Sequence, residues 1–248
     1  MNKKNKRRRS GWNTGTIGKK ETFTLLERLK MTWSAGVSVE KTFYEGAMIA
    51  NEKYILILVN TIIMLLTIAT AGVTIIGLLI VPAIIGGYLD SLIRITRNQP
   101  AKIGDFFKIV FKKKRFWSLT GGYYLAYLGI LVGFVFLVVP GIYLSVAWLF
   151  VWYLLVDKDL SIKKTFATSR HLIHNKTGFW NTLVVSFLLT VTTTIVSLIP
   201  FYIGFIIIIL LYPHIMMIYT VLYVDAVDRV RKRKGKFYRY YTLRFDDV

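Results

Sequence analysis

The chain has 248 residues, 54% of them hydrophobic, no cysteine and a formal net charge of +20. A chain without cysteine cannot form disulfide bonds, a thiolate nucleophile or a cysteine-based metal site. Its charged side chains are confined to blocks, because residues 54–89, 116–156 and 177–224 contain no Asp, Glu, Lys or Arg. This segregation excludes an ordinary soluble domain, whose helices would carry a polar face.

The N-terminal segment before the first apolar run falls into two parts. Residues 1–20 are basic and polar, which is typical of disorder. No apolar stretch follows them until Tyr54, so we do not expect a cleavable signal peptide. Residues 21–53 are mildly amphipathic, and two interpretations remain open: a helix lying at the membrane interface, or a helix that packs under the bundle.

Each of the three apolar runs is too long for one membrane span of about 20 residues. Each also has a Gly- or Pro-containing break near its middle, at Ala69–Gly72, at Pro140-Gly141 and at Ser197–Gly204. The sequence therefore predicts an all-α fold, a polytopic transmembrane helix bundle of about six spans in three hairpins, with cytoplasmic interfacial helices. We place the spans at 54–70, 72–93, 117–139, 141–156, 178–199 and 201–224.

The distribution of basic residues predicts the orientation. All 33 Lys and Arg lie in four segments, 1–53, 94–115, 157–176 and 225–248, which share one side in a three-hairpin topology. The positive-inside bias makes that side cytoplasmic, so we expect both termini in the cytoplasm. The resulting domains are a basic tail (1–20), an interfacial helical segment (21–53), a transmembrane domain (54–228) and a basic cytoplasmic tail (229–248).

Basic and aromatic residues occur together in the cytoplasmic loop 94–115 and in the C-terminal tail. Single-stranded nucleic acid could bind such a surface, but a tether to the bilayer favours anionic lipid, which attracts each basic residue by about 1 kcal/mol. We expect membrane lipids and an unidentified membrane or cytoplasmic protein as partners, and no nucleic acid; the sequence leaves the oligomeric state open. The expected lipid-contact residues are Lys112, Lys113, Lys114, Arg115, Arg231, Lys232 and Arg233.

The loop 157–176 is predicted to contain a short helix with Ser161 as its N-cap. Ile162, Phe166, Ser169 and Ile173 form a stripe at helical spacing. Such a stripe usually indicates burial, so a lid packed against the floor of the bundle is the favoured interpretation.

Three residues inside the spans are functional candidates. Pro82 and Pro213 fall within the second and sixth spans, where each should kink its helix and free a carbonyl, near Leu78 and Ile209 respectively. His214 is the one ionisable side chain well inside a span, which makes it a candidate by default. The alternative is a neutral histidine bonded within the bundle.

Hydroxyl side chains recur along the fifth span. They could line a polar path, or they could bond the carbonyls of their own helix. The residues are Ser186, Thr190, Thr192, Thr193, Thr194 and Ser197.

Three aspartates stand at the cytoplasmic ends of the even-numbered spans, and they could form a ring at a cytoplasmic mouth or pair with nearby Lys and Arg. The mouth candidates are Asp90, Asp157 and Asp225, with Ser169 and Arg170 from the loop helix.

The sequence contains no Gly-rich phosphate loop, no HExxH, no GxSxG and no His cluster with metal-ligand spacing. We therefore expect no catalytic site, no metal site and no cofactor.

Residues from about 75 to 228 carry a recognisable pattern. Pro140-Gly141-Ile142-Tyr143 opens a span and Val156-Asp157 closes it, followed by Leu160, by a helix with Ala167, Ser169 and Arg170, and by Gly178. This pattern resembles bacterial six-helix inner-membrane proteins related to the membrane domain of some glycerophosphodiester phosphodiesterases and to the YciC-like family. The resemblance implies a multi-pass bacterial plasma-membrane protein. It does not transfer the catalytic function of the fused relatives, because their phosphodiesterase barrel is absent here.

The sequence is compatible with two main functions. The first is a non-enzymatic protein that organises or protects the membrane, in envelope maintenance or in immunity to membrane-active peptides. The alternative is a permease, or a membrane subunit of an exporter, for a hydrophobic or amphipathic substrate. A membrane enzyme acting on lipid is a more distant third possibility.

Overall fold

The computed structural model describes residues 39–104, 107, 113–158, 160–234 and 237–242. Six helical stretches within these ranges are long and apolar enough to cross a membrane. The chain is therefore a multi-pass membrane protein with an all-α membrane domain, as the sequence predicts. The stretches are formed by α3 (Tyr54–Ala71), α4 (Ile75–Thr96), α6 (Lys113–Phe136), α7 (Val138–Ala147) with α8 (Val151–Asp157), α10 (Phe179–Ser197) and α11 (Phe201–Val227).

The first and third hairpin turns lie where Gly and Pro predict them. Between α3 and α4, Thr74 caps the second helix, and its Oγ1 accepts a hydrogen bond of 3.0 Å from the Gly77 backbone N–H. Between α10 and α11, the carbonyl of Pro200 accepts from the N–H groups of Ile203 and Gly204, which starts the last helix.

The second hairpin corrects the sequence prediction in two respects. Its turn is the single extended residue Leu137 (φ −162°, ψ 148°), and Pro140 and Gly141 lie inside α7. A proline in the first turn of a helix removes an N–H that has no helical partner, so Pro140 does not end a helix here. The expected fourth span is also interrupted, because a turn at 148–150 separates α7 from α8.

Helices from all three hairpins pack tightly together at one end of the molecule, which we call the base. It comprises Ala83–Thr96 of α4, Val146–Asp157 of α7 and α8, and Met217–Val227 of α11, whose apolar side chains are largely buried together. α11 packs there against α2 (Val39–Glu52), α3, α4 and α10. Gly46 of α2 allows this approach, because a Cβ atom on it would lie 2.8 Å from the Ile218 Cα.

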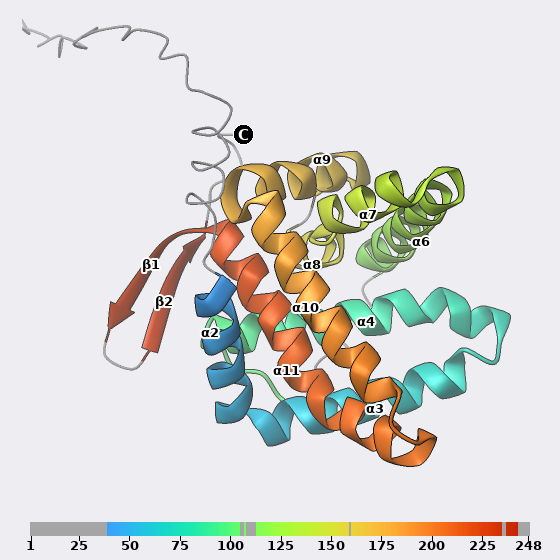
Figure 1. Cartoon of the computed structure of the whole chain (residues 1–248), viewed down its shortest axis with the longest axis horizontal. Helices are drawn as coiled ribbons and strands as arrows, with labels where there is room; N and C mark the ends of the chain where they lie inside the picture. Colours follow the sequence, from blue (N-terminus) through green and yellow to red (C-terminus); the bar gives the residue numbers. More distant parts are fainter. Residues whose placement is uncertain (1–38, 105–106, 108–112, 159, 235–236, 243–248) are drawn as a thin grey trace, which may run out of the picture.

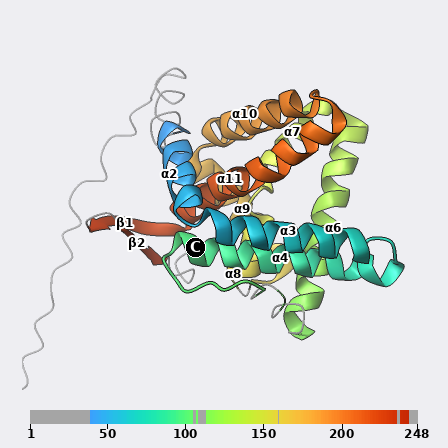
Figure 2. The same ribbon diagram turned by 90° about the horizontal axis from the view of Figure 1, so that it is seen from below.

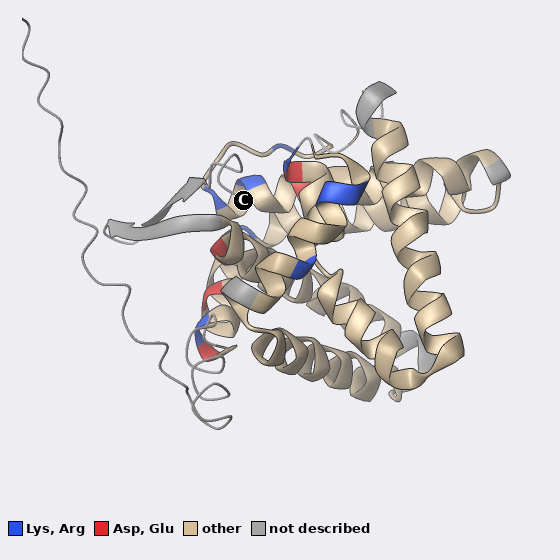
Figure 3. Ribbon diagram, turned by 90° about the horizontal axis from the view of Figure 1, so that it is seen from above, with Lys and Arg blue, Asp and Glu red and all other residues tan. Residues whose placement is uncertain are grey.

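The opposite ends of the hairpins, which we call the tips, comprise residues 65–79, 125–143 and 187–210. Their three turns point away from the base in different directions (Figures 1 and 2). Large apolar side chains are exposed along them, for example Leu66 (63% exposed), Val135 (77%) and Ile195 (59%). Charged residues of the described chain gather around the base, whereas the tips carry none (Figure 3).

Smaller elements complete the base. Residues 39–52, the described part of the amphipathic segment, pack against α11 as α2, which is the second of the two interpretations. α9 (Ile162–Leu172) begins at Ser161 as predicted, although the serine side chain makes no capping bond. A π-helical turn, η1 (Ile173–Thr177), leads to Gly178, whose φ of +78° redirects the chain into α10.

The C-terminal segment contains a feature that the sequence prediction lacks. β1 (Asp228–Lys234) and β2 (Phe237–Thr242) form an antiparallel pair in which Arg231 faces Tyr240 and Arg233 faces Tyr238. Aromatic residues favour strands, so the tyrosines interleaved with the basic residues are consistent with this hairpin.

Candidate functional site

A buried polar network ties three spans together at the base. Asp157, the last residue of α8, receives two parallel hydrogen bonds from Arg97, of 2.6 Å from Nη1 to Oδ1 and 2.9 Å from Nη2 to Oδ2. Tyr223 of α11 donates a third, 2.8 Å, to Oδ2, and Lys158 Nζ lies 3.4 Å from the same oxygen. The Asp157 and Arg97 side chains are each only 10% exposed. This bidentate, charge-assisted geometry is the strong form of an ion pair.

The sequence singles out Asp157 but not its two main partners. Arg97 follows the last residue of α4 as its C-cap, and Tyr223 lies two residues before another candidate, Asp225. No local pattern marks either residue, because the network joins positions 60 and 66 residues apart along the chain.

The remaining mouth candidates have separate environments. Asp90 pairs with Arg94 one helical turn later, at 2.7 Å, on the partly exposed side of α4. Asp225 is partly buried near the end of α11. Asp90 and Asp157 are thus each paired with an arginine, and they do not form an open ring of carboxylates.

Ser169 and Arg170 are adjacent in α9 but face opposite ways. Ser169 is buried, and its hydroxyl donates a 2.9 Å hydrogen bond to the Ala147 carbonyl at the end of α7. Arg170 is exposed. The buried serine therefore fastens α9 to the break between α7 and α8, in agreement with the packed lid expected from the stripe.

His214 lies beside the start of the first span rather than midway through the membrane domain. Its Nε2 donates to the Asn51 side-chain oxygen at 2.9 Å, and its ring centroid is 5.4 Å from that of Tyr54. The other ring nitrogen, Nδ1, is buried and has no hydrogen-bond partner among the described residues. The histidine consequently links α11 to the junction of α2 and α3.

Both prolines inside spans are buried, and hydroxyl groups from other helices bond carbonyls next to them. In α4, the Leu78 carbonyl, four residues before Pro82, accepts a 2.6 Å hydrogen bond from Tyr124. In α11, a carbonyl near Pro213 accepts a 3.0 Å bond from Tyr54, but it is that of Leu210 rather than the expected Ile209. The Tyr124 bond compensates for the backbone partner that Pro82 removes. The Leu210 carbonyl, in contrast, is not the one that Pro213 deprives of its helical donor.

The hydroxyl ridge of α10 does not line a polar path. The side chains of Thr190, Thr192, Thr193 and Ser197 donate to carbonyls three or four residues earlier in their own helix. Most of these residues are also exposed. These four hydroxyls thus bond their own helix, which is the second of the two expected arrangements.

The expected lipid-contact residues lie at the limits of the described structure. Lys112 is outside the described residues. Only the backbone is described for Lys113–Arg115, in the first turn of α6, and for Arg231, Lys232 and Arg233, in β1. Contact of these side chains with lipid stays a prediction.

Within the described ranges no three His, Asp or Glu side chains are grouped so that they could hold a metal ion. No protein-family model, no curated protein and no solved structure matches the chain. The geometry of the base and the tips is therefore what indicates a function.

Proposed function

We propose that this protein has no catalytic activity and organises or protects the bacterial cytoplasmic membrane through contacts with lipid. The observation that carries this proposal is the shape of the membrane domain. Three apolar tips spread from one packed base, so lipid can surround each hairpin. A spread structure has a larger lipid-facing perimeter than a closed bundle of the same six spans.

The polar groups inside the spans support the same proposal. Asp90 and Asp157 are each paired with a basic side chain, and the hydroxyls of Thr190, Thr192 and Thr193 bond carbonyls of their own helix. Intramembrane transport sites normally need polar side chains that face a shared interior. The basic segments then lie on the cytoplasmic side, where anionic lipid would attract them.

Protection against membrane-active peptides gives the direct test. Vesicles of phosphatidylethanolamine and phosphatidylglycerol, with and without the purified full-length protein, would be loaded with a self-quenching dye and treated with a cationic amphipathic peptide. We expect the protein to lower dye release at a given peptide concentration by severalfold. Vesicles containing an unrelated six-span protein at equal density are the control. Equal release from both preparations would contradict the proposal.

A permease or exporter subunit is the second candidate, favoured by the two Pro-broken helices and by His214. If helix breaks serve transport, Pro82→Ala, Pro213→Ala and His214→Ala should each abolish the export of an amphipathic substrate while leaving protein levels unchanged. If the protein protects the bilayer, the same three variants should retain the protection seen in vesicles. The two candidates therefore predict opposite outcomes for one set of variants.

A further inference from the structure

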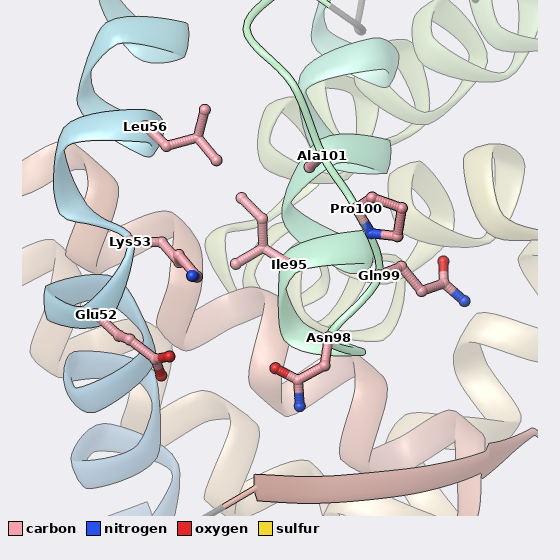
Figure 4. A pocket seen from close by; sticks show the side chains of 8 residues that line it. All are labelled: Glu52, Lys53, Leu56, Ile95, Asn98, Gln99, Pro100 and Ala101. Atoms are coloured by element: carbon pink, nitrogen blue, oxygen red, sulfur yellow. The ribbon is translucent and has the colours of Figure 1, made fainter.

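A cavity of about 530 Å³ opens at the base, where α2 passes into α3 and faces the end of α4. Figure 4 shows Glu52, Lys53 and Leu56 reaching from the α2–α3 side towards Ile95 and Asn98. The first span begins at Tyr54 and the second ends at Thr96, so the cavity straddles the boundary between membrane spans and the charged base.

A rigid chain reversal forms one wall of the cavity. The Asn98 N–H bonds the Ile95 carbonyl and the Gln99 N–H bonds the Arg94 carbonyl, both within 3.0 Å, while Asn98 has a φ of +55°. This is a Schellman motif with asparagine at its left-handed position, and Pro100 follows it. The wall is therefore fixed by the backbone, and the Asn98 side chain is held at the mouth.

The lining changes from apolar to charged along the cavity. Leu56 and Ile95 supply the apolar part. Glu52 and Lys53 supply opposite charges at adjacent positions, and both side chains are exposed. Neither forms an ion pair or a side-chain hydrogen bond with any residue that the structure describes. Opposite charges at adjacent positions beside an apolar slot match a ligand that carries both charges and an apolar chain.

Asn60 provides a second polar feature on the same face of α3, one turn beyond Leu56. Its side chain is 1% exposed, and its oxygen accepts a 3.1 Å hydrogen bond from the Gly104 N–H, which holds the loop that follows the Schellman motif. Its amide nitrogen is buried without a partner among the described residues. Asn60 does not line the cavity, so its part is to hold the loop beside the cavity in place.

We infer that this cavity binds a phosphoethanolamine group, the headgroup of a zwitterionic phospholipid. The phosphate pairs with the Lys53 ammonium, the ligand ammonium pairs with the Glu52 carboxylate, and the Asn98 amide bonds a phosphate or ester oxygen. The first part of an acyl chain follows Leu56 and Ile95 into the membrane. The inference rests on the proposed function, because it names the lipid that a membrane-organising protein would hold.

Competing headgroups fit less well. An anionic headgroup without an ammonium would leave Glu52 beside a phosphate, and like charges repel. A choline headgroup retains both charges, but its quaternary nitrogen has no N–H to donate to Glu52. The charge-assisted hydrogen bond that choline lacks distinguishes the two zwitterions.

The test measures lipid binding to the purified full-length protein in detergent micelles by native mass spectrometry. We expect phosphatidylethanolamine to bind about fivefold to tenfold more tightly than phosphatidylglycerol or phosphatidylcholine. Lys53→Gln and Glu52→Gln should each weaken phosphatidylethanolamine about tenfold. The matched controls Lys41→Gln and Glu40→Gln change exposed residues of α2 that do not line the cavity, and they should bind like the unaltered protein. Equal affinities for all three lipids, or equal losses in cavity and control variants, would overturn the inference.

Two further arms separate the possible explanations. Asn98→Gly keeps the left-handed backbone and removes only the amide, so it should weaken binding about threefold without loss of folding. Soluble phosphoethanolamine should compete at millimolar concentration if the headgroup alone is recognised. Failure to compete, together with loss of selectivity between the three headgroups, would assign recognition to the acyl chain and overturn the headgroup assignment. If the Lys53→Gln variant protects vesicles as well as the unaltered protein does, lipid binding in the cavity is not needed for protection. That result would leave the proposed membrane role intact.

Discussion

Long apolar stretches run through both the base and the tips of this molecule, but the side chains in the two regions have opposite environments. At the base, Tyr88, Phe150 and Tyr223 are completely buried among other side chains. At the tips, residues of the same classes are exposed on hairpins that diverge. The comparison indicates that protein packing holds the fold together at the base, whereas the tips are suited to contact lipid.

The side-chain hydroxyls of the base and of α10 follow the same division, although Tyr124 and Tyr54 bond the tip carbonyls of Leu78 and Leu210 from other helices. At the base, the Tyr88 hydroxyl meets the Thr61 hydroxyl at 2.8 Å between two helices, and Asp157 joins three spans. At the tip of α10, hydroxyls bond only their own helix. Interactions between helices should therefore contribute to stability mainly at the base, and substitutions in the two regions can test this difference.

The largest effect is expected at Asp157. Asp157→Ala removes the carboxylate that Arg97 and Tyr223 bond in the largely buried network, which should lower the free energy of unfolding by about 3–5 kcal/mol. Asp90→Ala removes the partly exposed pair with Arg94 and should cost about 0.5 kcal/mol. The free energies would be measured by unfolding in mixed micelles of a mild detergent and SDS. Similar losses for the two variants would show that the buried network does not hold the base together.

The next largest difference is expected when a large apolar side chain is shortened to alanine, at the base and at a tip. Leu222 is 0% exposed in α11, so Leu222→Ala should leave a cavity and cost about 2–4 kcal/mol. Leu128, 54% exposed on α6, should tolerate Ala with a loss below about 1 kcal/mol, because lipid can fill the vacated space. The same unfolding measurement compares the two. If Leu128→Ala proves as costly as Leu222→Ala, the tip of α6 must pack against protein, such as a second copy.

The sequence predicts the spans well because lipid imposes long charge-free runs, and Gly and Pro mark two of the three hairpin turns. It places the second turn wrongly, since Pro140 is equally compatible with a turn and with the first turn of a helix. It also cannot separate base from tips. Burial against protein and burial in lipid both select apolar residues, so hydropathy is uniform along a span that changes environment halfway.

The candidate site is predictable only in part, for a related reason. Asp157, Pro82 and His214 attract notice because they are unusual in apolar surroundings. Their partners Arg97, Tyr124 and Asn51 are ordinary in their local sequence, and only the fold brings them into contact. The cavity beside Lys53 is likewise invisible in sequence, because its two walls come from helices joined through a distant hairpin tip.

Substitutions at the tips should generally cost little stability, but Gly77 is expected to be an exception. A Cβ atom on Gly77 would lie 1.6 Å from the carbonyl oxygen of Ala71, so Gly77→Ala must shift the backbone of the α3–α4 turn. We expect a loss of about 1–3 kcal/mol. Gly121→Ala is the control, since its Cβ would meet only Ile162 at 3.6 Å and alanine favours a helix. A neutral Gly77→Ala variant would show that the turn relaxes freely in lipid.

The smallest predicted effect concerns the hydroxyl that bonds the carbonyl freed by Pro82. Tyr124→Phe removes the 2.6 Å bond to the Leu78 carbonyl and should cost about 0.5–1.5 kcal/mol. Tyr127→Phe, on the exposed side of the same helix, should change stability by less than about 0.5 kcal/mol.

A double-mutant cycle then tests the cause of that loss. Pro82→Ala supplies a backbone N–H four residues after Leu78, which restores the helical partner of this carbonyl. In the Pro82→Ala background, Tyr124→Phe should therefore cost less than in the unaltered protein, by about 0.5 kcal/mol or more. Additive losses would mean that Tyr124 stabilises α4 by packing alone. A coupled result would mean that the carbonyl freed by Pro82 depends on a donor from α6, so that the second hairpin stabilises the first.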